Sequence, residues 1–126
     1  MFLYGGTKKV NLLEIIVNDF EKIYRKPVIY IEAEKFINEL VCAVRERKKD
    51  KFNQKYRNTY LLIINNIQFI AGKSYSTQVL ISILKELEHK GRQIVLSANC
   101  NPNYIKGLDG ELRCYCFGGL IFKISS

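Results

Sequence analysis

Apolar residues follow two alternating patterns along this chain. Short runs of aliphatic and β-branched residues predict buried strands, at Met1–Tyr4, Val28–Ile31, Tyr60–Ile64, Ile94–Leu96 and Leu120–Ile124. Between them, apolar residues recur at helical spacing, in the groups Leu13, Ile16, Val17, Phe20, Tyr24; Phe36, Ile37, Leu40, Val41, Val44; and Val79, Leu80, Ile83, Leu84, Leu87. This alternation predicts an α/β fold, a three-layer parallel five-stranded sheet with helices on both faces.

Turn-forming residues punctuate these elements. Pro27 blocks continuation of the first helix, Gly91 ends the third helical group, and Asn101-Pro102-Asn103 and Gly107–Gly110 interrupt the chain later. Phe52 and Tyr56 predict one further helical turn. Neither a linker nor an internal repeat stands out, so residues 1–126 are expected to form one domain.

The predicted topology places the functional site. In open parallel sheets, ligands bind at the carboxyl ends of the strands. The segments that follow Tyr4, Ile64 and Leu96 are therefore the ones in which chemistry is expected.

Composition narrows the class of protein. The 126 residues are 48% hydrophobic and 25% charged, which is ordinary for a globular domain. Neither a signal peptide nor an apolar run of the roughly 18 residues that a membrane helix needs is present, so a cytoplasmic protein without a membrane partner is expected. Cys42, Cys100, Cys114, Cys116 and the single His89 lack zinc-site spacing, which predicts free thiols and no metal centre.

The net charge of +8 has two interpretations. Such an excess suits an anionic partner, above all a nucleic acid. A lysine-rich composition that serves only solubility produces the same charge, and the charge alone does not separate the two.

Several segments resemble the DnaA and Hda family of bacterial replication initiators, which are AAA+ ATPases. Leu61–Lys73 reads LLIINNIQFIAGK, where the family typically has LLIDDIQFFAGK, and Val28–Phe36, Lys51–Arg57 and Gly91–Ser97 are similar to VVYLHSERF, EEFKRYYR and GKQIVLTS. The resemblance is collinear over nearly the whole chain. It implies a P-loop NTPase core with sheet order 5-1-4-3-2, and we expect the helical lid domain to be absent.

The family's phosphate loop, YGGxGxGKTH, is altered in this sequence. The matching stretch holds Gly5, Gly6, Lys8 and Lys9, is shorter, and has Val10 where a hydroxyl normally binds magnesium. A triphosphate needs glycine N–H groups, a lysine and that hydroxyl. We expect the loop to be vestigial, with residual anion binding by Lys8 or Lys9 as the alternative.

The positions that resemble the family's other catalytic motifs have also changed. Asn65 and Asn66 stand at the Walker B carboxylates, Asn99 at the sensor 1 aspartate, and Tyr115 at the arginine finger. A neutral amide is a poor ligand for magnesium and cannot act as a base. The resemblance with these departures implies a pseudo-ATPase that uses no cofactor; ATP and magnesium would enter only if residual binding survives.

Basic residues gather in the region that meets single-stranded DNA in the DnaA relatives: Arg45, Arg47, Lys48, Lys49, Lys51, Lys55 and Arg57. Such residues can bind phosphates, and interleaved rings can stack on bases. The alternative for the basic residues is a solvated helix face. The alternative for the rings is that Phe52 and Tyr56 pack inward as an i,i+4 pair.

Three functional hypotheses follow. The first is an inactive DnaA-like module that modulates replication initiation by binding an active homologue, single-stranded DNA or both. The second is a slow ATPase that keeps Lys9 and recruits another carboxylate such as Asp109. The third is a stand-alone module that binds single-stranded nucleic acid.

Overall fold

The computed structural model describes residues 1–5, 9–118 and 121–124, with the backbone alone for residues 9, 10 and 121–124. Its elements are β1 (Phe2–Gly5), α1 (Lys9–Tyr24), β2 (Val28–Glu32), α2 (Ala33–Arg45), α3 (Lys49–Arg57), β3 (Leu61–Asn65), the 3-10 turn η1 (Ile67–Ile70), α4 (Ser74–His89), β4 (Gln93–Ala98), the 3-10 turn η2 (Pro102–Tyr104), α5 (Gly110–Phe117) and β5 (Ile121–Ile124).

The five strands form one sheet in the order β2-β3-β4-β1-β5, and neighbouring strands are all parallel. This is the predicted order 5-1-4-3-2 counted from the opposite edge. The inner strand β3 is buried along its whole length, as expected for a continuous apolar run in a parallel sheet. The α/β fold class is confirmed.

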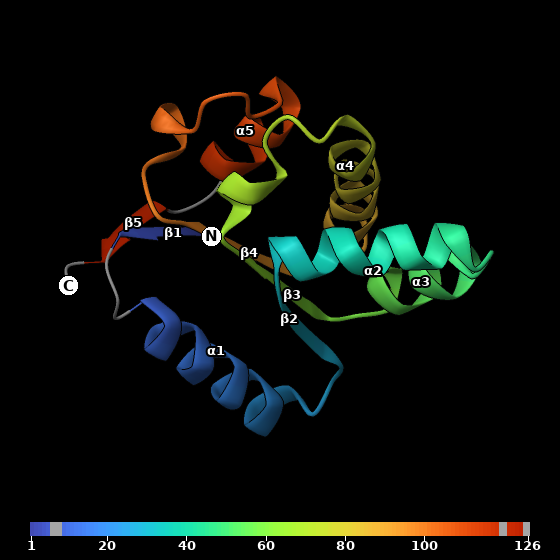
Figure 1. Ribbon diagram of the computed structural model, residues 1–126. Helices are drawn as coiled ribbons and strands as arrows, with labels where there is room; N and C mark the ends of the chain where they lie inside the picture. Colours follow the sequence, from blue (N-terminus) through green and yellow to red (C-terminus); the bar gives the residue numbers. More distant parts are fainter. Residues whose placement is uncertain (6–8, 119–120, 125–126) are drawn as a thin grey trace.

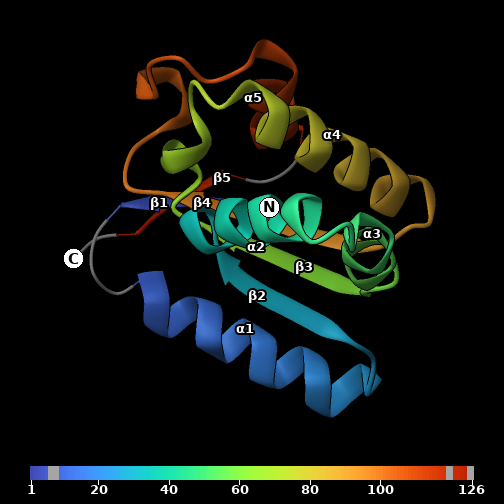
Figure 2. The same ribbon diagram turned by 45° about the vertical axis from the view of Figure 1, so that its right-hand side comes forward.

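Helices cover the two faces of the sheet unequally. Figures 1 and 2 show α1 on one face, while α2, α3, α4 and α5 lie on the other. The larger buried cluster, which includes Phe36, Leu40, Leu62, Ile64 and Leu84, fills the space under these four helices. A smaller cluster lies under α1 and consists of Leu3, Leu13, Leu61, Ile63 and Val95.

The observed elements extend the predicted ones by a few residues, and three were not predicted: α5, η1 and η2. Helix α5 buries only Leu112 and Cys116, so it leaves little periodic signal in the sequence. Strand bounds also differ from the predicted ones: β1 and β3 are each shifted one residue toward the C-terminus, β2 reaches Glu32, and β4 runs from Gln93 to Ala98. Leu120, predicted to open the last strand, lies outside the described residues.

None of the helices in the described ranges combines the length and the apolar character that crossing a membrane requires.

Candidate functional site: the carboxyl edge of the sheet

Strands β1, β3 and β4 end at the same edge of the sheet, because neighbouring strands in this sheet are parallel. At that edge lie Gly5, Asn65 and the turn after Ala98. Gly5 has a φ of 121°, a conformation that side-chain-bearing residues rarely adopt. The three segments singled out from the sequence are therefore brought together as predicted.

Asn65 is buried and paired across the sheet. Its side chain is 2% exposed, and its Oδ1 accepts a hydrogen bond of 2.5 Å from the Oγ of Ser97, which is fully buried. Strand alternation puts Asn65 on the same face as Leu61 and Ile63, which pack under α1. The amide at the Walker B position thus joins β3 to β4, and no motif in the sequence indicates that Ser97 is its partner.

Asn66 and Asn99 shape the turns beyond the two strands. Asn66 adopts the left-handed conformation, with φ 59° and ψ 49°, and leads the chain from β3 into η1. Asparagine tolerates this conformation better than most residues. The exposed Asn99 donates its backbone N–H to Oε1 of Gln68 at 3.3 Å, so η1 touches the end of β4. Gln68 is a further site residue that the motif comparison did not single out.

The phosphate-loop residues lie mostly outside the described part of the chain. Gly6 and Lys8 belong to the residues that are not described, and Lys9 opens α1, where only its backbone is described. The positions predicted for residual anion binding therefore stay a prediction.

The described side chains do not fit a magnesium ion. In the described ranges, no group of three or more His, Cys, Asp or Glu side chains is placed to hold a metal. Asp109, the carboxylate considered as a substitute, caps α5 instead, because its Oδ1 accepts hydrogen bonds from the backbone N–H groups of Glu111 at 2.8 Å and Leu112 at 3.2 Å. Glu32 ends β2 in register with Asn65, but a single carboxylate beside amides is a poor magnesium site.

Tyr115 lies elsewhere in the molecule. It is partly buried on α5 and lines a cleft between α4 and α5, together with Lys85, Glu88 and the β4 residue Gln93. Burial, and then the negative charge of Glu88, raise the pKa of Tyr115 above its usual value. Since Gln93 begins β4, Tyr115 is not brought together with Asn65, Asn66 and Asn99.

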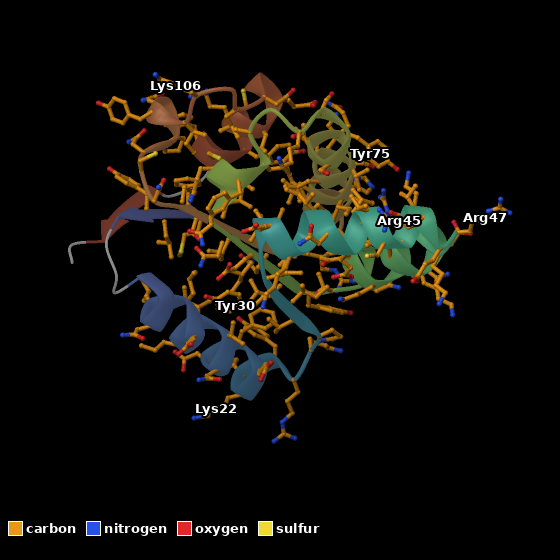
Figure 3. The ribbon with its side chains drawn as sticks, viewed as in Figure 1. Lys22, Tyr30, Arg45, Arg47, Tyr75 and Lys106 are labelled. Carbon is orange, nitrogen blue, oxygen red and sulfur yellow. The ribbon has the colours of Figure 1, made fainter. Side chains whose placement is uncertain are left out.

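Five basic residues form an exposed cluster where α2 turns into α3, here called the basic tip: Arg45, Arg47, Lys48, Lys49 and Lys51. Figure 3 shows Arg45 and Arg47 at this end of the helix pair, with Arg47 pointing away from the molecule. Among the described residues, Arg45, Arg47 and Lys51 form no ion pair. Nζ of Lys49 lies 5.2 Å from the ring centroid of the exposed Tyr75.

The other two basic residues of the predicted set are held by intramolecular ion pairs. Lys55 Nζ lies 2.9 Å from Glu39 Oε1. Arg57 bonds Glu86 through Nη1 and Ser82 through Nη2. Both side chains therefore stabilise the packing of α3 and have less freedom to bind phosphates than the basic tip has.

Phe52 and Tyr56 face the core. They are 4% and 0% exposed and pack against Phe36, with ring centroids 5.5 Å and 5.2 Å from its own. The inward i,i+4 interpretation is confirmed, so these rings cannot stack on bases in this structure. Tyr75 and Phe69, which are 52% and 48% exposed, are two of the exposed rings among the described residues on this side of the sheet.

Comparisons with known proteins extend these observations. Residues 1–123 match the family model described as the bacterial DnaA ATPase domain. The chromosomal replication initiator protein DnaA of Buchnera aphidicola subsp. Cinara cedri is 38% identical over 128 residues, which cover 99% of this chain and 29% of the relative. The chain thus spans less than a third of that curated relative's length.

Solved structures agree with the sequence match. Domain III of the Thermotoga maritima replication initiation protein DnaA is 32% identical with a TM-score of 0.94, covering 98% of this chain and 53% of that one. A replication initiator DnaA bound to AMPPCP and single-stranded DNA is 28% identical with a TM-score of 0.94, covering 98% of this chain and 39% of that one. Together with the family match over residues 1–123, this likeness shows that the chain belongs to the bacterial DnaA ATPase-domain family.

Proposed function

We propose that this replication initiator domain is a pseudo-ATPase, a module that modulates the initiation of DNA replication by binding an active homologue, single-stranded DNA or both. The observation that carries the proposal is the buried bond between Ser97 and Asn65. This bond engages a neutral amide at the position where the Walker B motif of this family would have a carboxylate.

The chemistry of the site supports this proposal. Phosphoryl transfer depends on electrostatic stabilisation by metal ions and on a group that orients the nucleophile. An amide oxygen that already accepts a hydrogen bond offers little to a hard cation, which prefers carboxylates and water. Asn66 and Asn99 add further neutral side chains at the same edge. We infer that the domain turns over no ATP.

Calorimetry and a turnover assay test the loss of catalysis. We expect no magnesium-dependent ATP hydrolysis above a protein-free control, and no stronger ATP binding when magnesium is added. The double variant Asn65→Asp/Asn66→Asp is expected to stay inactive, because the sequence also lacks the hydroxyl at Val10. Turnover by the unaltered chain would contradict the proposal, and turnover restored in the double variant would show that the phosphate loop still functions.

Binding of single-stranded DNA is assigned to the basic tip. Its side chains are exposed or half-buried and lie at the end of α2, in the turn after it and in the first turn of α3. Three of them form no ion pair among the described residues. Phosphates bind such clusters by counterion release, and an exposed ring such as Tyr75 can stack on a base.

Charge-reversal variants distinguish DNA binding at the basic tip from attraction by the overall net charge. The variant Lys48→Glu/Lys49→Glu/Lys51→Glu is compared with Lys22→Glu/Lys35→Glu/Lys106→Glu, which changes the net charge equally at exposed positions on other parts of the surface. We expect affinity for an oligo-dT to fall at least about tenfold in the first variant, and its log–log salt slope to drop by about 2, since each phosphate contact on a single strand contributes about 0.7. Equal losses in both variants would contradict the assignment.

Association with an active homologue is tested by sedimentation of the domain mixed with a full-length, ATP-bound DnaA. Co-sedimentation in the absence of DNA supports the regulatory form of the proposal. Binding to single-stranded DNA without any association would instead favour the stand-alone nucleic-acid module.

A further inference from the structure

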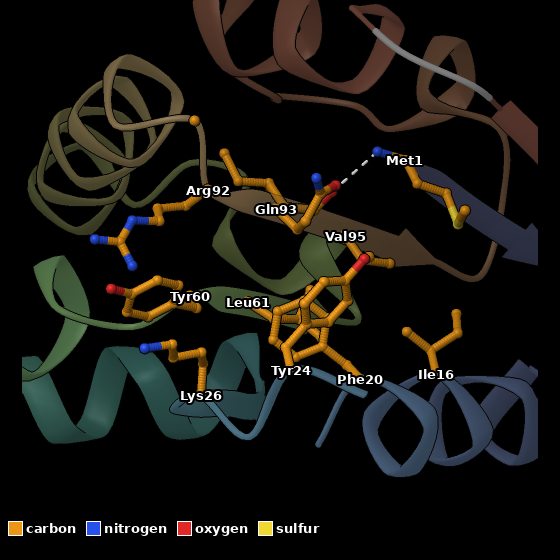
Figure 4. Close-up of a pocket in the computed structure, with 12 residues that line it drawn as sticks. Met1, Ile16, Phe20, Tyr24, Lys26, Tyr60, Leu61, Arg92, Gln93 and Val95 are labelled. Carbon is orange, nitrogen blue, oxygen red and sulfur yellow. Dashed lines mark hydrogen bonds between the residues drawn. The ribbon is translucent and has the colours of Figure 1, made fainter. Parts of the chain in front are cut away.

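A pocket opens at the edge of the sheet opposite to Asn65. It lies between α1 and the amino ends of β3 and β4, and has a volume of about 470 Å³. Figure 4 shows Ile16, Phe20 and Tyr24 of α1 facing Leu61, Gln93 and Val95 of the strands across it. Pockets of some hundreds of cubic ångströms are the usual size of small-molecule sites.

The interior of the pocket is apolar. Ile16 and Phe20 are only partly buried and pack on the cluster that contains Leu61 and Val95. The partly buried Ile16 and Phe20 on the α1 wall leave apolar surface that a ligand could remove from water, at about 25 cal/mol per Å². The apolar walls therefore favour a ligand with a hydrophobic body.

Two cations lie at one end of the pocket. Cζ of Arg92 is 3.3 Å from the ring centroid of Tyr60, and Nζ of Lys26 is 5.2 Å from the same centroid. Figure 4 draws Arg92 above the Tyr60 ring and Lys26 below it. A hydrogen bond to Arg92 and the positive charges of Arg92 and Lys26 lower the pKa of Tyr60. The positive charges at this end of the pocket therefore act on Tyr60, which also lines the pocket.

The guanidinium of Arg92 is incompletely paired. Its Nη1 is buried and has no hydrogen-bond partner. In the described part of the chain, no other buried side-chain nitrogen or oxygen lacks a partner. A buried donor without an acceptor costs about 1–3 kcal/mol, and more for a charged group. Since Nη1 has no accessible surface, an anionic head at this end of the pocket would instead be attracted by the positive charge of the partly exposed Arg92 side chain.

We propose that this pocket binds a small amphipathic organic anion, with an apolar body between α1 and the sheet and an acidic head at Arg92 and Lys26. Charge complementarity identifies the head, and the apolar walls with the volume of the pocket identify the body. The site is separate from the nucleotide-binding edge, because it lies at the amino ends of the strands. Its occupancy is therefore independent of the proposed loss of ATPase activity.

Two fluorescent probes with the same aromatic body test the proposal. 1-Anilinonaphthalene-8-sulfonate carries an anionic head, and N-phenyl-1-naphthylamine lacks it. We expect the sulfonate to bind at one site per chain, and Arg92→Gln and Lys26→Gln each to weaken it about tenfold, the size of one lost charge-assisted contact. Affinity for the neutral amine should change less than about twofold, since its body meets the same apolar walls.

Further variants complete the test. Ile16→Trp fills the pocket and should reduce binding of both probes at least about tenfold, whereas Arg47→Gln removes an exposed arginine of the basic tip and should change neither. Circular dichroism and thermal unfolding identify any variant that does not fold. Sulfonate binding that survives Ile16→Trp, or falls equally in Arg47→Gln and Arg92→Gln, would overturn the proposal.

Discussion

Asn65 and Ser97 link two strands at the point where the sheet meets the expected nucleotide edge. Both side chains are buried, and the bond between them joins residues 32 positions apart in the sequence. In a protein interior, removing one partner of a hydrogen bond lowers stability because the other partner is left buried and unpaired. The pair therefore stabilises the fold at a position where relatives with a carboxylate would place charge.

Ser97→Ala is expected to lower the free energy of unfolding by about 1–3 kcal/mol, because it leaves the Asn65 amide oxygen buried without its partner. Chemical denaturation measures this change. The matched control is Ser74→Ala, at an exposed residue that begins α4, which should cost less than about 0.5 kcal/mol. Equal losses in the two variants would show that the buried bond contributes nothing specific.

Tyr56 makes the fold sensitive to alkali. Its burial, then the negative charge of Glu39 and the hydrogen bond that its hydroxyl donates to Glu39, raise the pKa of Tyr56 above its usual range. A group with a raised pKa in the folded state contributes stability that is present below the unfolded pKa of about 10 and is lost as the pH rises beyond it. The protein should therefore lose stability steeply above about pH 10.

Tyr56→Phe tests this expectation through denaturation curves recorded on both sides of that pH. At neutral pH the variant should lose about 0.5–1.5 kcal/mol with the bond to Glu39. Above about pH 10 its stability should decline less steeply than that of the unaltered chain. Parallel declines would assign the alkaline loss to other groups.

At the scale of elements, α3 is fastened to α4 by one arginine. Arg57 bonds Glu86 and Ser82 on α4, and Nζ of Lys90 donates to the backbone carbonyl of Arg57 at 3.0 Å. The hydrogen bond and charge of Arg57 lower the pKa of Glu86 below its usual value. These contacts hold the helix whose first turn carries part of the basic tip.

Arg57→Ala should reduce stability by only about 1 kcal/mol, because the ion pair is partly exposed to solvent. Its local effect should be larger, with faster hydrogen exchange in α3 than in α2. High salt should reduce the difference between the variant and the unaltered chain. Unchanged exchange in α3 would contradict the fastening role.

The elements that carry a strong apolar period are predictable from the sequence, whereas α5 and the two short 3-10 turns, which lack one, are not. Strand β3 and helices α2 and α4 were found because their core faces are continuous. Helix α5 has only two buried side chains among its described residues. Its clearest signal in the sequence is Asp109, which caps the helix, but the slow-ATPase hypothesis treats this residue as a metal ligand.

The candidate site was predictable in its positions but not in its contacts. Parallel topology places Gly5, Asn65 and Asn99 at one edge of the sheet, as the order of the strands predicts, while their part in a nucleotide site stays a prediction. The Ser97 bond, the ion pairs of Lys55 and Arg57, and the pocket beside Arg92 depend on side-chain geometry between segments distant in sequence. No spacing rule within one segment encodes them.

At the scale of the whole molecule, the two faces of the sheet contribute unequally to the core. Among the residues whose side chains are described, the buried cluster under α1 has five members, whereas the cluster under α2, α3, α4 and α5 has many more. Side chains of α1 such as Ile15, Ile23 and Tyr24 remain more than half exposed. Fewer buried contacts mean a lower free energy of local opening.

Hydrogen exchange should therefore be fastest, among the helices of ten residues or more, in α1, and slowest in β3 and β4. Native-state exchange followed by mass spectrometry measures the order. A saturating concentration of the anionic naphthalene probe should slow exchange in α1, because its apolar body contacts Ile16 and Phe20. Exchange in α1 as slow as in β3 would contradict the unequal layers.

This asymmetry predicts where the fold tolerates substitution best. Fewer described side chains are buried under α1 than under α2, α3, α4 and α5, so a large-to-small substitution under α1 leaves more of the core intact than one on the opposite face of the sheet.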